Sequence, residues 1–204
     1  MRVFNFNEQS TTYTSRVYCI LGNWNALQDV NTLVDVGRDP AIVMRLESLN
    51  TGLGKKKIDQ VIITHNHYDH TGVLSRIMER FSPKVLAFSS SVYEVDQCLR
   101  DGEFIHCGDE LCEVIHIPGH SHDSICLYAP ESKVLFSGDT PFTFLRVNSA
   151  YREGFLSALE KLSSRDVQRI YPGHGYPIEN KCNLLIQKTL DVVALSSNKR
   201  REAC

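Results

Sequence analysis

Residues 64–72, THNHYDHTG, concentrate three histidines and one aspartate within six consecutive positions. The residues before them, Ile58–Thr64, form a compact apolar run that is typical of a buried strand. The residues after them, from Val73 to Phe81, place apolar side chains at helical spacing. Because strand ends in α/β proteins are common positions for ligands and catalytic groups, the stretch is either part of a metal site or a loop that is histidine-rich by accident.

The order of these four side chains favours two metal ions rather than one. In an extended segment, residues i and i+2 point the same way, so His65 and His67 can converge on one point. Where the chain turns into the helix, Asp69 and His70 can face a second point nearby. Four ligands from one loop do not complete two coordination spheres, so a metal site requires further ligands at the ends of other strands.

Three later segments supply such ligands, and each follows an expected strand. Their sequences are PGHSH, SGDT and YPGHG, and each places a glycine directly before the potential ligand, which permits a tight turn. The ligands and the strands before them are His120 after Leu111–Ile117, Asp139 after Val134–Ser137, and His174 after Val167–Tyr171. The same arrangement after three separate strands indicates a metal site rather than an accidental cluster.

Together these segments resemble the metallo-β-lactamase superfamily of hydrolases. HNHYDH fits the HxHxDH motif of that family, and PGH, GDT and PGHG match its later ligand motifs in order and approximate spacing. The earlier segment LVDVG resembles its first motif. The resemblance covers roughly residues 15–178 and implies an α/β (α+β) fold, the four-layer αββα sandwich of two sheets flanked by helices.

The resemblance also implies a role for each matching residue. The ligands of the first metal are His65, His67 and His120, and those of the second are Asp69, His70 and His174. Asp139 matches the carboxylate that bridges both ions. Asp35 matches a supporting residue that orients a ligand, although an aspartate that caps the turn after a strand is an open alternative.

We expect two divalent metal ions, with zinc preferred and iron or manganese as alternatives, because imidazoles and carboxylates accept all three. In the expected mechanism a metal-bridging hydroxide attacks an acyl carbonyl, one ion polarises the carbonyl oxygen and the other stabilises the leaving group. Asp69 is the expected catalytic residue, since it can orient the hydroxide as well as hold metal. The sequence contains no G-x-S-x-G elbow that would supply a serine nucleophile.

The full set of seven ligands resembles the glyoxalase II branch, the hydroxyacylglutathione hydrolases, and implies a hydrolase of a thioester or related acyl ester. Those enzymes bind glutathione through a helical extension after the last histidine, whereas the 30 residues after His174 provide one helix and a basic tail. The thiol carrier is therefore left open. A bridging aspartate at the position of Asp139 argues against a zinc β-lactamase.

Other activities remain as alternatives. A lactonase or a phosphodiesterase would use the same metals, but quorum-quenching lactonases often place a tyrosine shortly after the bridging aspartate, where this chain has Pro141 and Phe142. A phosphodiesterase would favour more positive charge near the site. From a different class, a mononuclear iron persulfide dioxygenase uses a subset of these ligands. A non-catalytic metal-binding scaffold is disfavoured by the complete ligand set.

The composition narrows the class of partner. A net charge of −2 argues against nucleic acid as the main partner. No apolar run reaches the ~20 residues of a membrane helix, and the N-terminus lacks the pattern of a signal peptide. Seven cysteines, an odd number without a C-x-x-C pair, favour buried free thiols in a reducing cytosol. We expect a cytoplasmic protein that acts on a small-molecule substrate, and the composition predicts no oligomeric state.

The patterning predicts a single domain over residues 1–204. A helix is expected to begin at Asp39–Pro40, with the aspartate as N-cap. Ser91–Glu94 resembles a capping box and predicts a third helix that ends near Gly102. A closing helix at about 179–197 is expected to pack on the domain.

The second half of the chain predicts a hairpin and a helix. Ser124–Ala129 and Val134–Ser137 are expected to pair as a hairpin, and the apolar spacing predicts a helix from about Ala150 to Leu162. The segment between them, Thr140–Tyr151, follows the expected bridging aspartate and could line the substrate pocket. Phe142 and Phe144 would form an apolar wall there and Arg146 would meet a carboxylate; packing of both rings in the core, with a solvated arginine, is the alternative.

Overall fold

The computed structural model describes residues 1–92, 94–142 and 154–202, and its strands form two sheets. The first sheet, in spatial order, consists of β1 (Arg2–Asn5), β2 (Tyr18–Leu21), β3 (Thr32–Val34), β4 (Gln60–Ile63), β5 (Lys84–Ala87) and β6 (Gln97–Cys98). The second, in spatial order, consists of β11 (Arg169–Pro172), β10 (Val134–Gly138), β9 (Ile125–Ala129), β8 (Glu110–His116) and β7 (Phe104–Cys107).

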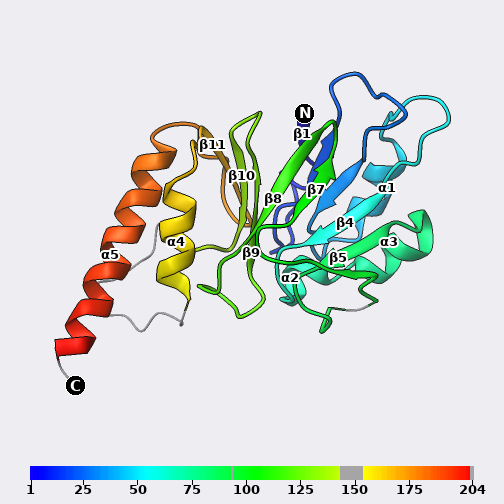
Figure 1. Cartoon of the computed structure of the whole chain (residues 1–204). Coiled ribbons are helices and arrows are strands. Elements are labelled where there is room, and N and C mark those ends of the chain that lie inside the picture. The colour runs from blue at the N-terminus through cyan, green and yellow to red at the C-terminus, as the bar shows by residue number, and fades with distance from the viewer. Residues whose placement is uncertain (93, 143–153, 203–204) are drawn as a thin grey trace.

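Helices cover the outer face of each sheet, as Figure 1 shows. The helices are α1 (Ala41–Glu47), α2 (Tyr68–Thr71), α3 (Leu74–Phe81), α4 (Phe155–Ser163) and α5 (Cys182–Glu202). α1 and α3 lie against the first sheet, and α4 and α5 lie against the second. The order of layers is therefore helix, sheet, sheet, helix, which confirms the predicted αββα sandwich.

The apolar run before the histidine cluster is buried on both of its faces. Val61 and Ile63 of β4 pack in the cluster between the first sheet and its helices, whereas Ile62 packs in the cluster between the two sheets. All three side chains are fully buried. A strand that is buried on both faces has no polar alternation, which explains why this segment appears in the sequence as a continuous apolar run.

The directions of the strands bring the expected ligands to one edge of each sheet. β3, β4 and β5 run parallel, so the residues that follow β3 and β4 leave the sheet at the same edge. In the second sheet β10 runs parallel to β11, and β8 and β10 are both antiparallel to β9. The residues that follow β8, β10 and β11 therefore also leave together. These are the segments that hold His120, Asp139 and His174.

The predicted helix from Ser91 to about Gly102 is wrong. The chain instead forms β6, which pairs in parallel with β5. The pairing continues on either side, because Asp96 N donates to Val85 O and Leu99 N donates to Ala87 O. The hydroxyl of Ser91 contacts that of Ser89 at 2.9 Å. The edge of β5 thus provides hydrogen-bond partners for the backbone of this segment, and the segment forms a strand although its local pattern favours a helix.

The other expected elements are present with shifted ends. α1 begins after Asp39, whose Oδ1 accepts a hydrogen bond from Ala41 N at 3.0 Å, and β9 and β10 form the predicted hairpin. α4 is described from Phe155, so residues 150–153 of the predicted helix, Tyr151 included, lie outside the described residues. α5 begins later than predicted and extends further, and its Ile186 packs with the α4 cluster.

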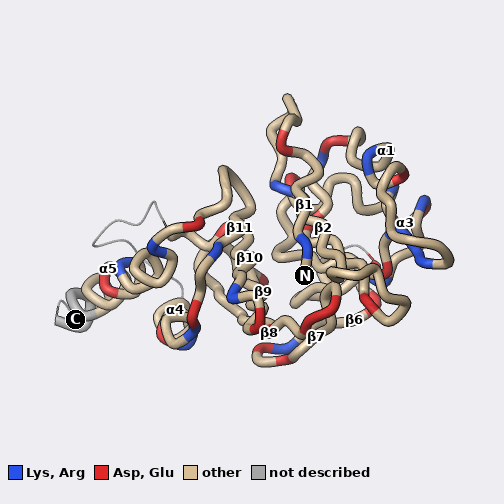
Figure 2. The backbone as a smooth tube through the Cα atoms, turned by 90° about the horizontal axis from the view of Figure 1, so that it is seen from above, with Lys and Arg blue, Asp and Glu red and all other residues tan. Residues whose placement is uncertain are grey.

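Charges of both signs are spread over the molecule. Figure 2 shows acidic and basic residues interspersed in both the β1–α3 half and the β7–α5 half. Within the residues that the structure describes, none of the helices has the length and apolar character to span a membrane.

Phe136 anchors the apolar layer between the two sheets and generates a stability prediction. Its side chain is 0% exposed and its ring stacks on Tyr171 at 5.2 Å. We expect Phe136→Ala to lower the free energy of unfolding by ~3–5 kcal/mol, because it removes the apolar contacts and leaves a cavity. Phe104→Ala, which truncates a ring that is 55% exposed on β7, should change it by no more than about 0.5 kcal/mol. Urea denaturation of the two variants measures the difference, and equal losses would contradict this assignment of the core.

Candidate metal centre

The histidine-rich loop connects β4 to α2 and divides its side chains between an extended and a helical part. His65 directly follows the strand end and is buried. His67 is the N-cap of α2 and keeps an extended backbone, with φ −83° and ψ 146°. Asp69 and His70 lie within α2. The change from strand to helix therefore falls between the first histidine pair and the Asp-His pair, as the sequence predicts.

Three histidines form the first group of potential ligands. The distance from His65 Nε2 to His67 Nδ1 is 3.0 Å, and His120 Nε2 lies 2.9 Å from the same His67 nitrogen. With Zn–N bonds of about 2.0–2.1 Å, the ligand nitrogens of a tetrahedral zinc ion lie roughly 3.3 Å apart. The three imidazoles thus converge to a spacing that a single ion can fill.

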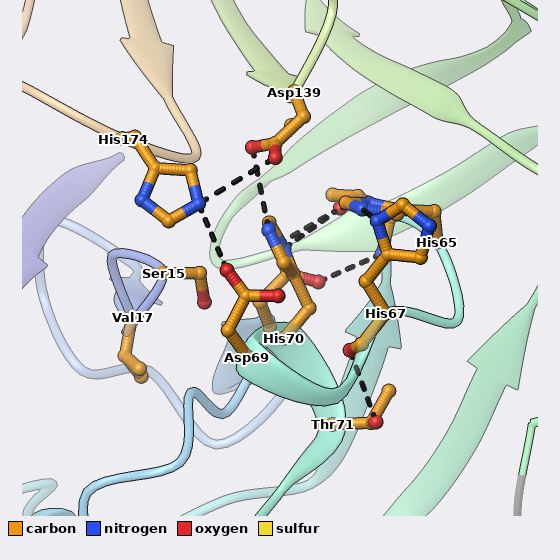
Figure 3. A network of polar contacts seen from close by, with 12 residues as sticks. Ser15, Val17, His65, His67, Asp69, His70, Thr71, Asp139 and His174 are labelled. Atoms are coloured by element: carbon orange, nitrogen blue, oxygen red, sulfur yellow. Dashed lines mark hydrogen bonds and ion pairs between the residues drawn. The ribbon is translucent and has the colours of Figure 1, made fainter. Parts of the chain in front are cut away.

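Asp69, His70 and His174 form a second group, and Asp139 lies between the two groups, as Figure 3 shows. His174 Nε2 is 3.0 Å from Asp69 Oδ2. Asp139 Oδ1 lies 3.3 Å from His70 Nε2, and its Oδ2 lies 3.5 Å from His174 Nε2 and 3.6 Å from His120 Nε2. The structure therefore brings all seven predicted residues together, with Asp139 in reach of both groups.

Several of these atoms lack the hydrogen bonds that buried polar atoms normally make. His70 Nε2, His174 Nε2 and Asp139 Oδ1 are buried without a hydrogen-bond partner of good geometry among the described residues. Asp139 Oδ1 and His70 Nε2 face each other at 3.3 Å, while His174 Nε2 faces carboxylate oxygens of Asp69 at 3.0 Å and of Asp139 at 3.5 Å. A divalent cation would satisfy all three atoms, so the donor set fits a metal.

The charges of the histidines differ in the absence of metal. Burial, together with the positive charge of His70, lowers the pKa of His65 to about 4. Burial also opposes the charged form of His70, but the carboxylates of Asp35 and Asp139 outweigh it and raise its pKa to about 10. The contact of its Nε2 with the Asp139 carboxylate, at 3.5 Å, raises the pKa of His174. A proton on His70 thus lies beside Asp139 where a cation would bind, and a metal must displace it.

Asp35 supports the cluster from the end of β3. Its Oδ2 accepts a hydrogen bond from His70 Nδ1 at 2.7 Å, which leaves Nε2 of that ring for the centre. It also accepts bonds from the backbone N–H and the hydroxyl of Thr64, at 2.8 and 2.9 Å. Since these bonds go to the neighbouring strand and to a candidate ligand, they favour the orienting role over that of a turn cap.

The sequence alone does not reveal the part that Thr64 plays. Its hydroxyl lies 3.2 Å from His65 Nδ1 while it donates to Asp35, so it connects this carboxylate to a second histidine. A threonine at the end of an apolar strand carries no pattern that distinguishes it from a surface residue. The only available signal is its position directly before the first histidine.

The remaining histidines have other surroundings. His116 Nε2 lies 2.7 Å from the backbone oxygen of His122, and its ring stacks on Phe88 at 3.9 Å. His122 and His106 are exposed. None of the three belongs to a potential metal group among the described residues.

A pocket of about 460 Å³ opens beside the cluster, and its lining includes His120, Asp139 and His174. The other side chains that line it are mainly apolar: Thr140, Pro141, Phe142, Pro172, Tyr176 and Ile178. Phe142 is 8% exposed and packs in the α4 cluster as well as on the pocket, so both expectations for this ring hold in part. Phe144 and Arg146 lie outside the described residues.

Comparisons with known proteins agree with this geometry. A model of the metallo-beta-lactamase superfamily matches residues 26–174. A hydroxyacylglutathione hydrolase of Chromohalobacter salexigens is 29% identical over 165 residues, 77% of this chain and 63% of that protein. An atrochrysone carboxyl ACP thioesterase of Aspergillus fumigatus is 31% identical over 154 residues, 72% of this chain and 48% of that protein. The chain thus spans less than two thirds of both.

A solved structure shows the same fold. A metallo-beta-lactamase of Cronobacter sakazakii superposes with a TM-score of 0.68 at 16% identity, and the match covers 93% of this chain and 90% of that one. At this identity the likeness extends to the fold alone.

The bonds of Asp35 generate a first prediction. Asp35→Asn keeps the size of the side chain, and asparagine tolerates the positive φ of 57° at this position. It replaces a carboxylate oxygen with a donor, so we expect the metal-free protein to lose about 3 kcal/mol of unfolding free energy. Asp29→Asn is the matched control, a buried aspartate that accepts a bond from Ala26 N at 2.7 Å, and it should cost about 1 kcal/mol. Similar losses of unfolding free energy for the two variants in denaturant titrations would show that the hydrogen bonds of Asp35 contribute no more than that of Asp29.

The close packing at Gly173 generates a second prediction. A methyl group there would overlap the carboxylate of Asp139 and lie 2.9 Å from His70 Cε1. We expect Gly173→Ala to displace Asp139 and weaken zinc binding by ~10–100-fold, measured by competition with a chelator. Gly22→Ala is the control, because its methyl group would overlap the carboxylate of Asp29 in the same way at a distant loop. It should cost stability, by ~1–3 kcal/mol, and leave zinc affinity unchanged; equal zinc affinities of the two variants would refute the prediction.

Proposed function

The chain belongs to the metallo-beta-lactamase superfamily, and on this basis we propose that it is a binuclear metal-dependent hydrolase of thioesters or related acyl esters. One observation carries the proposal. Seven side chains from four loops arrange their nitrogen and oxygen atoms in two groups, and Asp139 reaches both. Two ions that share one carboxylate are the arrangement in which metal-assisted hydrolysis operates.

Each side chain has a proposed part in holding the ions. His65, His67 and His120 would hold the first ion, and Asp69, His70 and His174 the second. Asp139 would bridge them. The nitrogen and oxygen donors favour zinc and also accept iron or manganese, since none of the six cysteines that the structure describes belongs to either group.

The protein contributes orientation and exclusion of water. Two bound divalent ions would supply Lewis acidity and a hydroxide nucleophile at neutral pH. Asp69 directs Oδ2 towards His174, so its other oxygen could accept a hydrogen bond from the hydroxide and orient it. Asp35 fixes the His70 ring through Nδ1. The apolar wall of Phe142, Pro141 and Ile178 would keep bulk water from the acyl group.

The proposed substrate class rests on the relatives and on the pocket. The names of both curated relatives denote hydrolysis of an acyl group from a sulfur carrier, glutathione in one and a carrier protein in the other. A pocket of about 460 Å³ with a mainly apolar lining suits a small acyl chain. The substrate is therefore proposed as a small-molecule thioester.

The state of the cysteines supports the proposed cytoplasmic location. Six cysteines are free in the described part of the chain, and all but Cys98 are buried. Free thiols are the usual state in a reducing compartment.

The proposal predicts hydrolysis that depends on two ions and on both groups of ligands. Purified protein loaded separately with zinc, iron and manganese would be assayed against thioesters, lactones and a phosphodiester, with metal content measured in parallel. We expect thioester hydrolysis with about two ions per chain and its loss on chelation. His65→Ala and Asp139→Ala should each lower kcat/KM by more than the ~100-fold that loss of an outer supporting residue costs.

Other outcomes would redirect the assignment. A greater rate with lactones or the phosphodiester would keep the centre and change the substrate. One iron per chain with oxygen uptake on a persulfide would identify a dioxygenase instead. Full activity in both alanine variants would exclude the binuclear mechanism. Arg76→Ala on the exposed face of α3 controls for nonspecific effects.

A further inference from the structure

The segment before β2 is attached to both sides of the candidate centre. Ser15 N donates to Asp69 O at 3.0 Å, and Arg16 N donates to Gly173 O at 2.7 Å. Asp69 and the neighbour of Gly173, His174, are candidate ligands. Figure 3 shows Ser15 beside Asp69 and His174. The backbone of this segment is therefore held in place by the same loops that carry the ligands.

The segment places an aromatic ring on one of these ligands. The ring of Tyr13 stacks on His174, with centroids 5.2 Å apart and planes inclined by 16°. The guanidinium of Arg38 also lies against this ring, with its Cζ 5.9 Å from the ring centroid. The backbone N–H of Arg38 donates a hydrogen bond to Thr14 Oγ1 at 2.9 Å, which ties Arg38 to the same segment. Tyr13 is 70% exposed, so this stack faces solvent beside the centre.

A second arginine, Arg16, contacts two residues that line the pocket. Arg16 Nε donates to Gly175 O at 2.9 Å, and its Cζ lies 5.8 Å from the ring centroid of Tyr176. Gly175 and Tyr176 both line the pocket of about 460 Å³. Each arginine thus lies against a tyrosine ring. Arg38 lies against Tyr13, which stacks on His174. Arg16 lies against Tyr176, which lines the pocket.

Both guanidinium groups lack an acidic partner. In the described ranges neither arginine forms an ion pair, whereas Arg80, Arg165 and Arg169 each do. Arg38 Nε is buried without a hydrogen-bond partner there. The acid next to it, Asp39, is engaged by Ser10 Oγ at 2.6 Å and by the N-terminus of α1. Within the described residues, neither positive charge is therefore neutralised by a carboxylate.

We propose that Arg16 and Arg38, with Tyr176 and Tyr13, form an anion-binding subsite around His174, beside the pocket. The ligand is a carboxylate or phosphate on the substrate, on the far side of the bond that is hydrolysed. A guanidinium presents a planar fork of donors that matches either oxyanion, and a ring beneath it holds the fork in position. This inference rests on the proposed hydrolase function and narrows its substrates to anionic thioesters or esters.

The first experiment measures binding without turnover. Thioether analogues that share one alkyl group and end in a neutral hydroxyl, a carboxylate or a phosphate would be titrated into the metal-loaded protein by calorimetry. We expect an anionic analogue to bind about tenfold more tightly than the neutral one, as charge-assisted hydrogen bonds imply. Arg16→Gln and Arg38→Gln should each reduce this ratio, and the double variant should bring it near one. Arg76→Gln, an exposed arginine on α3, should keep the wild-type ratio. The carboxylate and phosphate arms identify which oxyanion is preferred.

The second experiment measures hydrolysis of the corresponding thioesters, and it separates the inference from the function on which it rests. The ratio of kcat/KM for anionic and neutral thioesters should fall in the same variants. Arg38→Lys should restore it in part, because lysine keeps the charge and loses the fork. Hydrolysis without anion preference, or a preference that persists in the double variant, would overturn the subsite and leave the hydrolase intact. Arginine-dependent binding of the analogues without hydrolysis of any thioester would refute the hydrolase function and leave the anion-binding subsite intact.

Discussion

The carboxylate of Asp35 joins the end of β3 to the end of β4 and to the histidine-rich loop that follows it. It leaves the end of β3 and accepts hydrogen bonds from Thr64, at the end of β4, and from His70, within α2. Because Thr64 directly precedes His65, one buried carboxylate sets the direction of the histidine-rich loop at both of its ends. Because this loop is held in place, its ligands have fixed positions relative to the ligands that the second sheet contributes.

Much of the fold and of the candidate site follows from local patterns. The run that becomes β4 is apolar at every position since both of its faces are buried, and His120, Asp139 and His174 each follow a strand and a glycine. Such features depend on a few neighbouring residues, so the sequence alone reveals them. The pairing of these distant segments is not local, and it became predictable through the resemblance of their motifs to a family in which they lie together.

The parts that escaped prediction depend on contacts between distant segments. Ser91–Glu94 has the pattern of a helix start, yet the free edge of β5 pairs with the residues that follow it. The position of Tyr13 on His174 is set by backbone bonds from Ser15 and Arg16 to two other loops. No periodicity in a short polar segment signals such bonds. Thr64 likewise gains its role only from its neighbours in space.

Each group of ligands draws on both sheets. His65 and His67 come from the first sheet and His120 from the second, while Asp69 and His70 come from the first and His174 from the second. Neither half of the chain could complete the coordination of an ion alone. The proposed ions would therefore link the two sheets. They would bind with full affinity only after the sheets had packed against each other. Full coordination of the ions would then require that the two sheets have packed together.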